Sequence, residues 1–373
     1  MPRIGVARAV ATLTGVIVGT AAGVAPAAEF VPGMIYIGDS YTTICDYGPH
    51  RIWEVNPWTG EARVFVSDDD CPLFTGLRFT PDGSRLRVAA TRFRSVREID
   101  ADGNMVTVLD QSDGLFGPRH MAYDAEGNFY LNDGGTIERF AGEGGPREVV
   151  ADFFDGVRGG STIAFAADGD LYLAPGKNGA VQESQDYVLR FDPKTWEASI
   201  FDSDFPLIGD PTNVVTDRSG YVYLNFQRTI YRYRAGDPDS RTVISDGVFA
   251  PFGTGLSPDE RKLIGYWALA PRPEEYYTYV RSVDVRDGSV ETLGIIKGEY
   301  LEIGKLAVVP YIGPPGDSDV DGDVDGTDFA WFLECYTGPG GIMDPGCGLT
   351  DLDHDLDVDF TDFGVFQRSV THP

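Results

Sequence analysis

Apolar and polar residues alternate in short runs from Gly33 to Pro310, which is the period-two pattern of half-buried β-strands. One pattern recurs there: an apolar strand, an Asp-Gly-type turn, and a second strand that ends in an apolar triplet. Its copies read GLRFTPDGSRLRVAA, HMAYDAEGNFYLNDG, TIAFAADGDLYLAPG and NVVTDRSGYVYLNFQ, and a looser copy, TGLSPDERKLIGYWA, lacks the turn glycine. The four turn glycines are spaced by 44, 42 and 51 residues. This spacing is typical of a β-propeller blade of four antiparallel strands.

The second half of each repeat is a hairpin, as in RIWEVNPWTGEARVFV and YVLRFDPKTWEASIF, where two strands flank a tight polar turn. Five full repeats follow an incomplete one, because the segment from Met34 to Val66 supplies only three strands. The segment EIGKLAVVP, from Glu302 to Pro310, fits the missing first strand. The sequence therefore predicts a six-bladed β-propeller, closed by its C-terminal strand and without an open sheet edge. A two-sheet sandwich is a weaker alternative, because sandwiches do not repeat one pattern in this way.

Two acidic segments near the C-terminus add a second kind of structure. The first, DSDVDGDVDGTD, places carboxylates at positions 1, 3, 5, 9 and 12 of a twelve-residue loop, with Gly322 at position 6. This is the calcium loop of the EF-hand type, in which position 7 adds a backbone carbonyl and the glycine permits a sharp turn. The predicted Ca²⁺-binding residues of this loop are Asp317, Asp319, Asp321, Asp323, Asp325 and Asp328.

The second segment, DLDHDLDVDFTD, repeats this pattern 34 residues later. Leu356 stands at its position 6, where a branched side chain disfavours a positive φ, so we expect a weaker site. A solvated acidic tail is the alternative reading, because blocks of like charge are usually disordered. Aromatic residues at matched positions of the two following helices are not typical of such a tail. The predicted Ca²⁺-binding residues here are Asp351, Asp353, Asp355, Asp357, Asp359 and Asp362.

The duplicated loop-then-helix unit has no helix before either loop, and it resembles the type I dockerin module from Asp317 to about Gln367. The resemblance implies two calcium loops packed with pseudo-symmetry and docking to a cohesin domain, chiefly in enzymes that degrade polysaccharides. Positions 10 and 11, usually a small hydroxylated pair in cohesin-binding modules, read Gly326-Thr327 and Phe360-Thr361. Because neither loop has this pair, the expected partner is either a cohesin-like domain or another extracellular protein.

The N-terminus has the three regions of a secretory signal peptide: Arg3 and Arg8, an apolar run, and Ala25-Pro26-Ala27 before the cleavage point. We expect a secreted protein, because this run is short and no other segment could span a bilayer. The expected fold class is mainly β, with a six-bladed propeller and a small C-terminal α domain. The predicted segments are a signal peptide over 1–28, the propeller over 29–311, a Pro/Gly linker over 312–316 and a dockerin-like module over 317–373.

The net charge argues against one class of ligand, and the cysteine content suggests disulfide bonds. The formal net charge of −28 at pH 7 argues against nucleic-acid binding through the global field of the protein. Four cysteines in an exported chain suggest two disulfides, for which three connectivities exist. Local pairing gives Cys45 with Cys71 and Cys335 with Cys347, and free buried thiols are the alternative.

No catalytic motif is present, neither a GxSxG elbow nor an HExxH or Walker sequence. Propeller topology still predicts a site where the connections between blades, and those between second and third strands, meet around the channel. Guanidinium groups at that mouth favour an anionic ligand, such as a uronate-containing glycan. The alternative is that each arginine pairs with a nearby carboxylate. The predicted ligand-binding residues are Arg92, Arg94, Arg119, His120, Arg158, Asn213 and Arg228.

The blade pattern resembles the secreted six-bladed propellers of the NHL, streptogramin-lyase-like and gluconolactonase-like groups. Some of these relatives are metal-dependent lactonases or lyases and others only bind partners, so the resemblance leaves two hypotheses. One is a secreted calcium-binding protein whose propeller binds an anionic polysaccharide or a partner, and whose module tethers it to an extracellular or polysaccharide-degrading assembly. The other is a metal-dependent lactonase, or a lyase or hydrolase, with Asp210, Asn213 and Glu302 as candidate metal ligands at the channel mouth.

Overall fold

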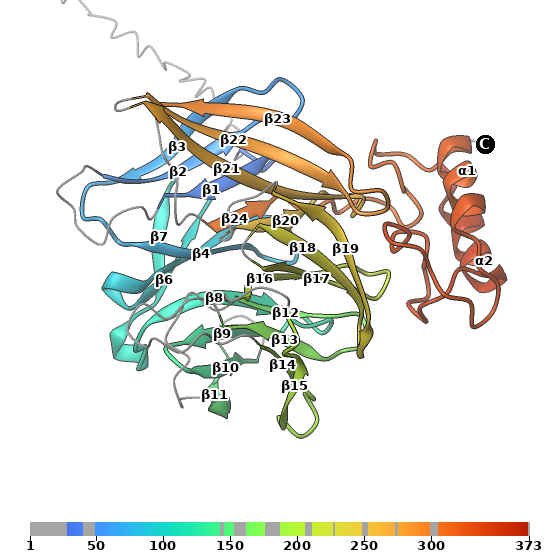
Figure 1. Ribbon diagram of the computed structural model, residues 1–373, viewed down its shortest axis with the longest axis horizontal. Coiled ribbons are helices and arrows are strands. Elements are labelled where there is room, and N and C mark those ends of the chain that lie inside the picture. The colour runs from blue at the N-terminus through green and yellow to red at the C-terminus, as the bar shows by residue number, and fades with distance from the viewer. Residues whose placement is uncertain are drawn as a thin grey trace, which may run out of the picture.

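The chain folds into a ring of six four-stranded antiparallel sheets followed by two α-helices. Figure 1 shows the sheets arranged around a central axis, with both helices outside the ring. This confirms the fold class expected from the sequence, a mainly β six-bladed propeller with a helical C-terminal region. The computed structural model describes residues 28–39, 49–141, 145–152, 162–175, 187–205, 211–226, 228–247, 253–272, 275–298 and 305–371.

Each sheet is one blade, whose four strands follow one another from the channel outwards. Blades one to three are formed by β24 (Lys305–Val308), β1 (Ile35–Gly38), β2 (His50–Val55) and β3 (Ala62–Asp68); β4 (Phe74–Phe79), β5 (Leu86–Ala90), β6 (Ser95–Ile99) and β7 (Met105–Leu109); and β8 (Pro118–Tyr123), β9 (Phe129–Asp133), β10 (Thr136–Phe140) and β11 (Arg147–Asp152). Blades four to six are formed by β12 (Thr162–Phe165), β13 (Leu171–Ala174), β14 (Val188–Phe191) and β15 (Ala198–Asp202); β16 (Pro211–Thr216), β17 (Tyr221–Phe226), β18 (Thr229–Arg234) and β19 (Asp237–Asp246); and β20 (Thr254–Leu256), β21 (Lys262–Arg272), β22 (Glu275–Asp284) and β23 (Val290–Lys297).

The ring is closed by β24, the last strand of the chain. It pairs antiparallel with β1, with Val308 opposite Ile35 and Lys305 opposite Gly38. The innermost strands contact one another in the order β24, β4, β8, β12, β16, β20 and back to β24. The closure predicted from the EIGKLAVVP segment is therefore confirmed, and blade one joins both ends of the propeller.

Tight turns join the first and second strands of the blades, as the recurring Asp-Gly pattern predicts. The turn glycines Gly83, Gly127, Gly169 and Gly220 all have positive φ, the conformation that favours glycine. In blade six Glu260 takes this place with φ +57, and the amide of Arg218 donates to its carboxylate at 2.9 Å. We call the end of the propeller that carries these turns the turn face, and the opposite end the mouth face.

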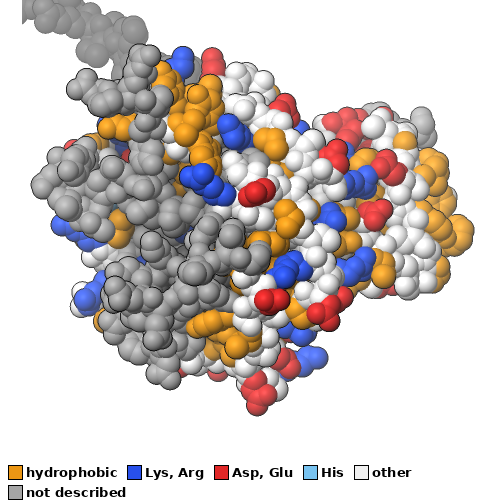
Figure 2. Space-filling view, viewed as in Figure 1, with side chains coloured by type: hydrophobic (Ala, Val, Ile, Leu, Met, Phe, Trp, Pro, Cys, Tyr) orange, Lys and Arg blue, Asp and Glu red, His pale blue; other side chains and the backbone are white. Residues whose placement is uncertain are grey.

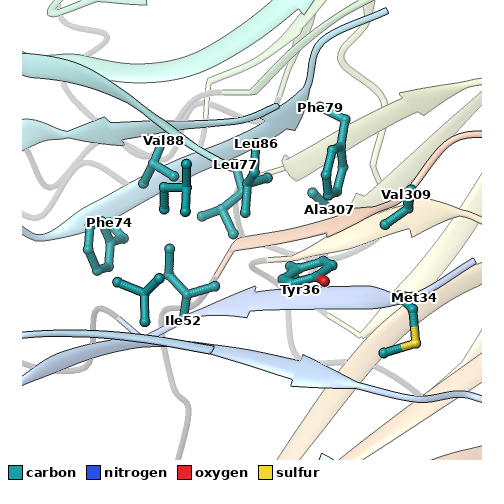
Figure 3. Packing of buried hydrophobic residues seen from close by; sticks show 12 residues of the cluster. Met34, Tyr36, Ile52, Phe74, Leu77, Phe79, Leu86, Val88, Ala307 and Val309 are labelled. Carbon is teal, nitrogen blue, oxygen red and sulfur yellow. The ribbon is translucent and has the colours of Figure 1, made fainter. Parts of the chain in front are cut away.

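The core lies between neighbouring blades, because the alternating apolar side chains of each sheet pack against those of the next. Figure 3 shows the cluster between blades one and two, where Tyr36, Ile52, Phe74 and Leu77 meet. All four side chains are buried. Burying large apolar side chains in this way contributes about 1.5–3 kcal/mol each relative to exposure, so the blade interfaces supply much of the stability.

Two ten-residue helices, α1 (Gly326–Cys335) and α2 (Phe360–Ser369), follow the acidic loops. Each begins with a capping box: the Asp325 side chain accepts from the amide of Thr327, and the Asp359 side chain accepts from that of Thr361. None of the helices in the described part of the chain has the length and apolar character needed to cross a membrane. We call residues 317–371 the acidic module.

The acidic module packs against the turn face of blades five and six (Figure 1). The Trp331 ring of α1 is contacted by two propeller guanidinium groups, Arg261 at 3.4 Å and Arg286 at 4.7 Å from its centroid. The amide of Cys347 donates to Ser219 Oγ at 3.0 Å. Cation–π pairs that are partly desolvated contribute about 1–2 kcal/mol each. The module is thus held directly by the propeller and not only through the chain that joins them.

Candidate functional site

The acidic module brings the carboxylates of each predicted calcium loop together. Four groups of three carboxylates have oxygens that lie within 4.8 Å of one another. They come from both loops, and no comparable group of His, Cys, Asp or Glu occurs elsewhere in the described residues. The groups are Asp317, Asp319 and Asp328; Asp323, Asp325 and Asp328; Asp351, Asp353 and Asp355; and Asp357, Asp359 and Asp362.

The carboxylate at position 12, the last residue of each loop, accepts hydrogen bonds from several backbone amides of that loop. Asp328 is fully buried and accepts from the amides of Ser318 at 2.6 Å and Asp319 at 3.2 Å, and from the amide of Asp325 at 2.8 Å. Asp362 is also fully buried and accepts from the matched amides of the second loop, those of Leu352, Asp353 and Asp359, at 2.6, 3.2 and 2.8 Å. The duplication seen in the sequence is therefore a duplication of geometry.

Two buried carboxylate oxygens indicate that these loops suit a cation. Within the described residues, Asp319 Oδ1 and Asp357 Oδ1 are buried and accept no hydrogen bond. Burial, followed by the negative charges of Asp328 and Asp321, raises the pKa of Asp319. A buried acceptor without a partner is costly, and hard oxygens at this spacing are what Ca²⁺ prefers. The residues present thus fit a metal ion, and Ca²⁺ is the ion that the loop pattern predicts.

The two loops have the same backbone path but not the same residue at position 6. Gly322 has φ +104 in the first loop, and Leu356 has φ +72 in the second. A branched residue held in the left-handed region costs about 1–2 kcal/mol. The Leu356 side chain also lies beside blade five, because a Cβ placed on Gly220 would be 3.9 Å from its Cδ2. The structural reason for expecting a weaker second site is therefore present.

Each loop is capped by the threonine that follows the helix of the other repeat. The amide of Val324, at position 8 of the first loop, donates to Thr371 Oγ1 at 2.8 Å. The amide of Val358, at position 8 of the second loop, donates to Thr337 Oγ1 at 3.0 Å. These threonines were not predicted from the sequence, although they are also 34 residues apart and extend the repeat. Folding of one loop is thus coupled to folding of the other.

One of the two disulfides expected from the sequence lies within the described residues, and the other lies there only in part. Cys335 and Cys347, a pair expected from the sequence, are joined by a disulfide with an S–S distance of 2.07 Å. It ties the end of α1 to the connector that leads to the second loop. Cys71 is buried, and its expected partner Cys45 lies outside the described residues, so that pairing stays a prediction.

The predicted channel residues His120 and Asn213 connect neighbouring innermost strands. His120 Nδ1 accepts from the amide of Ile163 on β12 at 3.2 Å. Thr162 Oγ1 accepts from the amide of Val214 on β16 at 2.8 Å. The Asn213 amide nitrogen donates to the Thr254 carbonyl on β20 at 3.0 Å. These side chains form one layer across the channel, and part of their hydrogen-bonding capacity is used to hold the ring together.

The arginines predicted at the mouth are held by aromatic rings. Arg94, in the connection after β5, lies 5.5 Å from the ring centroid of Phe116, and Arg228, directly before β18, lies 4.3 Å from that of Trp267. Within the described residues no ion pair includes Arg94, Arg119 or Arg228. Arg92 is exposed in the same connection as Arg94. Arg158 lies outside the described residues, as do Asp210 and Glu302.

Arginines elsewhere on the propeller behave differently. Arg97 pairs with Asp68 at 2.7 Å, and Arg87 pairs with Glu98 at 2.7 Å. The others that form carboxylate pairs are Arg63, Arg147, Arg190, Arg218, Arg241 and Arg286. The alternative that each mouth arginine pairs with a local carboxylate thus has no support at Arg94, Arg119 or Arg228 among the described contacts. When an aromatic ring stacks on the face of a guanidinium group, the in-plane N–H donors of that group remain available for a ligand.

Two further basic residues lie on the innermost strands, and neither was predicted from the sequence as a site residue. Arg78 is on β4 and Lys305 is on β24. Burial and the guanidinium of Arg119 lower the pKa of Lys305 to about 7. Burial, followed by the charges of Lys305 and Arg78, lowers the pKa of His120 well below its usual range. The channel therefore gathers four basic side chains in a strongly acidic protein, and the guanidinium groups of Arg78 and Arg119 carry its positive charge at neutral pH.

Comparisons with known proteins support the fold alone. By sequence, the chain matches no protein-family profile and no curated protein. By structure, it is similar to a chain in the crystal structure of a nidogen/laminin complex, with a TM-score of 0.52 and 16% identity over 74% of this chain and 100% of that one. TolB from Acinetobacter baumannii also has a TM-score of 0.52, with 10% identity over 74% of this chain and 67% of that one. A streptogramin B lyase structure has a TM-score of 0.43 with 13% identity, over 74% of this chain and 98% of that one. We draw no conclusion from a similarity this low.

Proposed function

We propose that this protein is a secreted binding protein whose propeller takes an anionic ligand, such as an acidic glycan, at its mouth face. The acidic module, loaded with Ca²⁺, would attach it to an extracellular or polysaccharide-degrading assembly. The Cys335–Cys347 disulfide fits an oxidising compartment, which supports the secretion that the N-terminal sequence predicts.

The observation that carries the ligand proposal is the sign of the charge around the channel. The described innermost strands hold Arg78, Arg119, His120 and Lys305 and no acidic residue, while the whole chain has a formal net charge of −28 at pH 7. A positive mouth on a negative surface draws in anions that the remaining surface repels. Guanidinium forks bind carboxylates bidentately, which adds geometric specificity to the attraction.

The surface of the acidic module that faces away from the propeller supports a docking role. Phe360 is 74% exposed and Leu333 is 57% exposed, and the ring of Tyr336 lies 5.7 Å from that of Phe360. Figure 2 shows hydrophobic side chains gathered at this outer end of the molecule. Contiguous exposed apolar groups often mark a protein-binding surface. A cohesin-like or other extracellular protein is the partner that the sequence resemblance suggests.

The enzyme hypothesis gains no comparable support. Asn213 uses its amide nitrogen to link innermost strands, and the other two candidate channel-metal ligands lie outside the described residues. The carboxylate groups that could hold a metal ion in the described part of the chain all belong to the acidic module. Ligand binding is therefore the function that we propose from the described residues.

Titration of the full protein with oligogalacturonate and with a neutral oligosaccharide of equal length tests this proposal. We expect the acidic ligand to bind more tightly and its affinity to fall with added salt, because partly exposed ion pairs are screened within about 8 Å at physiological ionic strength. Replacing Arg94 and Arg228 together with Met should weaken binding by about tenfold or more and flatten the salt dependence.

The matched control is Arg63→Met, since Arg63 is exposed but already pairs with Glu54 on blade one. This variant should bind the acidic ligand as the wild type does. Equal affinity for the acidic and neutral ligands, or the same loss in the control as in the double variant, would refute the proposal.

A further inference from the structure

Blade two departs from the blade repeat on its innermost strand by placing a charged residue there, whereas blade six pairs Gly255 with Ile264 at the equivalent position. Four blades place an uncharged residue of the first strand, alanine in three of them and valine in the fourth, opposite a tyrosine of the second strand. These pairs are Ala122 with Tyr130, Ala164 with Tyr172, Val215 with Tyr223, and Ala307 with Tyr36. In blade two the same position pairs Arg78 with Arg87. Positions where a sequence departs from its own repeat are often functional.

Arg78 reaches the water of the channel. Its strand β4 is innermost, and the neighbouring side chains Leu77 and Phe79 are buried, yet Arg78 itself is exposed. A residue at the centre of the ring can be exposed only towards the channel. Strand β4 lies directly beside β8, since a Cβ placed on Gly76 would be 3.1 Å from the Cα of His120, and the charge of Arg78 acts on His120 and on the Tyr123 hydroxyl.

Arg119 adds a donor that has no partner within the described residues. Its Nε atom is buried and makes no hydrogen bond there. The carboxylate that acts on it electrostatically, Asp133, already accepts from the amides of Phe116 at 2.8 Å and Gly117 at 2.5 Å. Asp133 also lies 4.0 Å from Arg147. One carboxylate is therefore shared by two basic groups, Arg119 and Arg147, and the guanidinium of Arg119 keeps unused donors.

His120 supplies a further donor to the same cluster. Its Nδ1 accepts from the amide of Ile163, so the proton of the neutral ring is on Nε2. The positive charges of Arg78 and Lys305 lie close enough to His120 to disfavour its charged form. Like charges gathered in a partly desolvated site favour a bound counter-anion, because an anion offsets their mutual repulsion.

We propose that Arg78, Arg119 and His120 form a subsite inside the channel that binds a single carboxylate, the acidic end group of a ligand whose remaining units lie on the mouth face. This deepens the proposed function and rests on it for the identity of the ligand. The planar guanidinium groups match a carboxylate. Lys305 adds positive charge to the same space.

The test is calorimetric titration of the full protein with D-glucuronate, with D-glucose and with inorganic phosphate, at low salt. We expect glucuronate to bind and glucose not to bind. Arg78→Ala should weaken glucuronate binding by about tenfold to a hundredfold, the effect of losing a hydrogen bond to a charged group. This variant should fold, because three of the other blades have alanine at that position. Arg119→Met should have an effect of similar size.

The ring resonances of His120 provide a readout that does not depend on the variants, since they should shift when glucuronate is added. Arg94→Met is the control: it should weaken oligogalacturonate binding and leave glucuronate binding unchanged. If the wild type bound glucuronate but not oligogalacturonate, the proposed role of the mouth face would be wrong while the subsite proposal would stand. The subsite proposal is overturned if glucose and glucuronate bind alike, if phosphate binds and glucuronate does not, or if Arg78→Ala and Arg119→Met both bind glucuronate normally.

Discussion

Asp328→Ala is expected to unfold the acidic module while the six blades remain folded. The variant removes the position-12 carboxylate, which three backbone amides use as their acceptor. Amides left buried without an acceptor cost about 1–3 kcal/mol each, and a helix N-terminus loses its capping box. The first loop also loses an oxygen donor for Ca²⁺. The second loop should follow, because Thr337 and Thr371 connect the two repeats.

Hydrogen exchange of peptides from α1 and α2, with and without calcium, measures this effect. In the wild type, calcium should slow exchange in both helices, since ligand binding stabilises by about 2.7 kcal/mol at a concentration one hundred times Kd. In Asp328→Ala this protection should vanish while blade peptides stay protected. Asp344→Ala is the charge-matched control, because Asp344 is exposed and belongs to neither loop. Calcium-dependent protection that persists in Asp328→Ala would contradict the account.

The second large effect concerns pH and the buried Asp217, which lies near the partly buried Glu260 next to the docked module. Burial, followed by the charge of Glu260, raises the pKa of Asp217 to about 7. The unfolded chain releases this proton near pH 4, whereas the folded protein keeps it until about pH 7. The unfolding free energy should therefore fall as pH rises through this window. The expected decrease is of the order of a few kcal/mol.

Denaturant unfolding between pH 4 and 8 tests the prediction. Asp217→Asn should flatten the decrease, because asparagine does not titrate. Asp124→Asn is the matched control, since Asp124 in blade three also accepts from a turn amide, that of Asn128, and from a tyrosine hydroxyl, that of Tyr130. The control should keep the slope of the wild type. A slope unchanged by Asp217→Asn would show that other groups dominate the pH dependence.

The sequence predicted the parts of the fold that follow from local rules. Blade number and closure follow from turn chemistry and strand alternation, and even the blade that lacks a turn glycine keeps the turn, with Glu260 at φ +57. The calcium loops follow from ligand spacing, and Leu356 shows the positive φ that made its loop suspect. In each case one short segment contains the information.

Contacts between distant segments could not be predicted in the same way. Nothing local to Trp331 indicates that Arg261 and Arg286 hold it against the propeller, because these residues meet only in the tertiary fold. Arg78 lies on a strand, where propeller topology predicts no site residue, because it predicts the site in the connecting loops. Its signal was nevertheless present, since aligning the blades shows arginine where other blades have an uncharged residue.

Counting the calcium ions bound to the full chain tests the central claim most directly, because that claim is a calcium-loaded binding propeller rather than a metal-dependent enzyme. Native mass spectrometry after equilibration with calcium should show two ions per chain in the wild type and none in the Asp328→Ala, Asp362→Ala double variant. An ion that remains bound in the double variant, or a wild-type chain that binds none, would contradict the account.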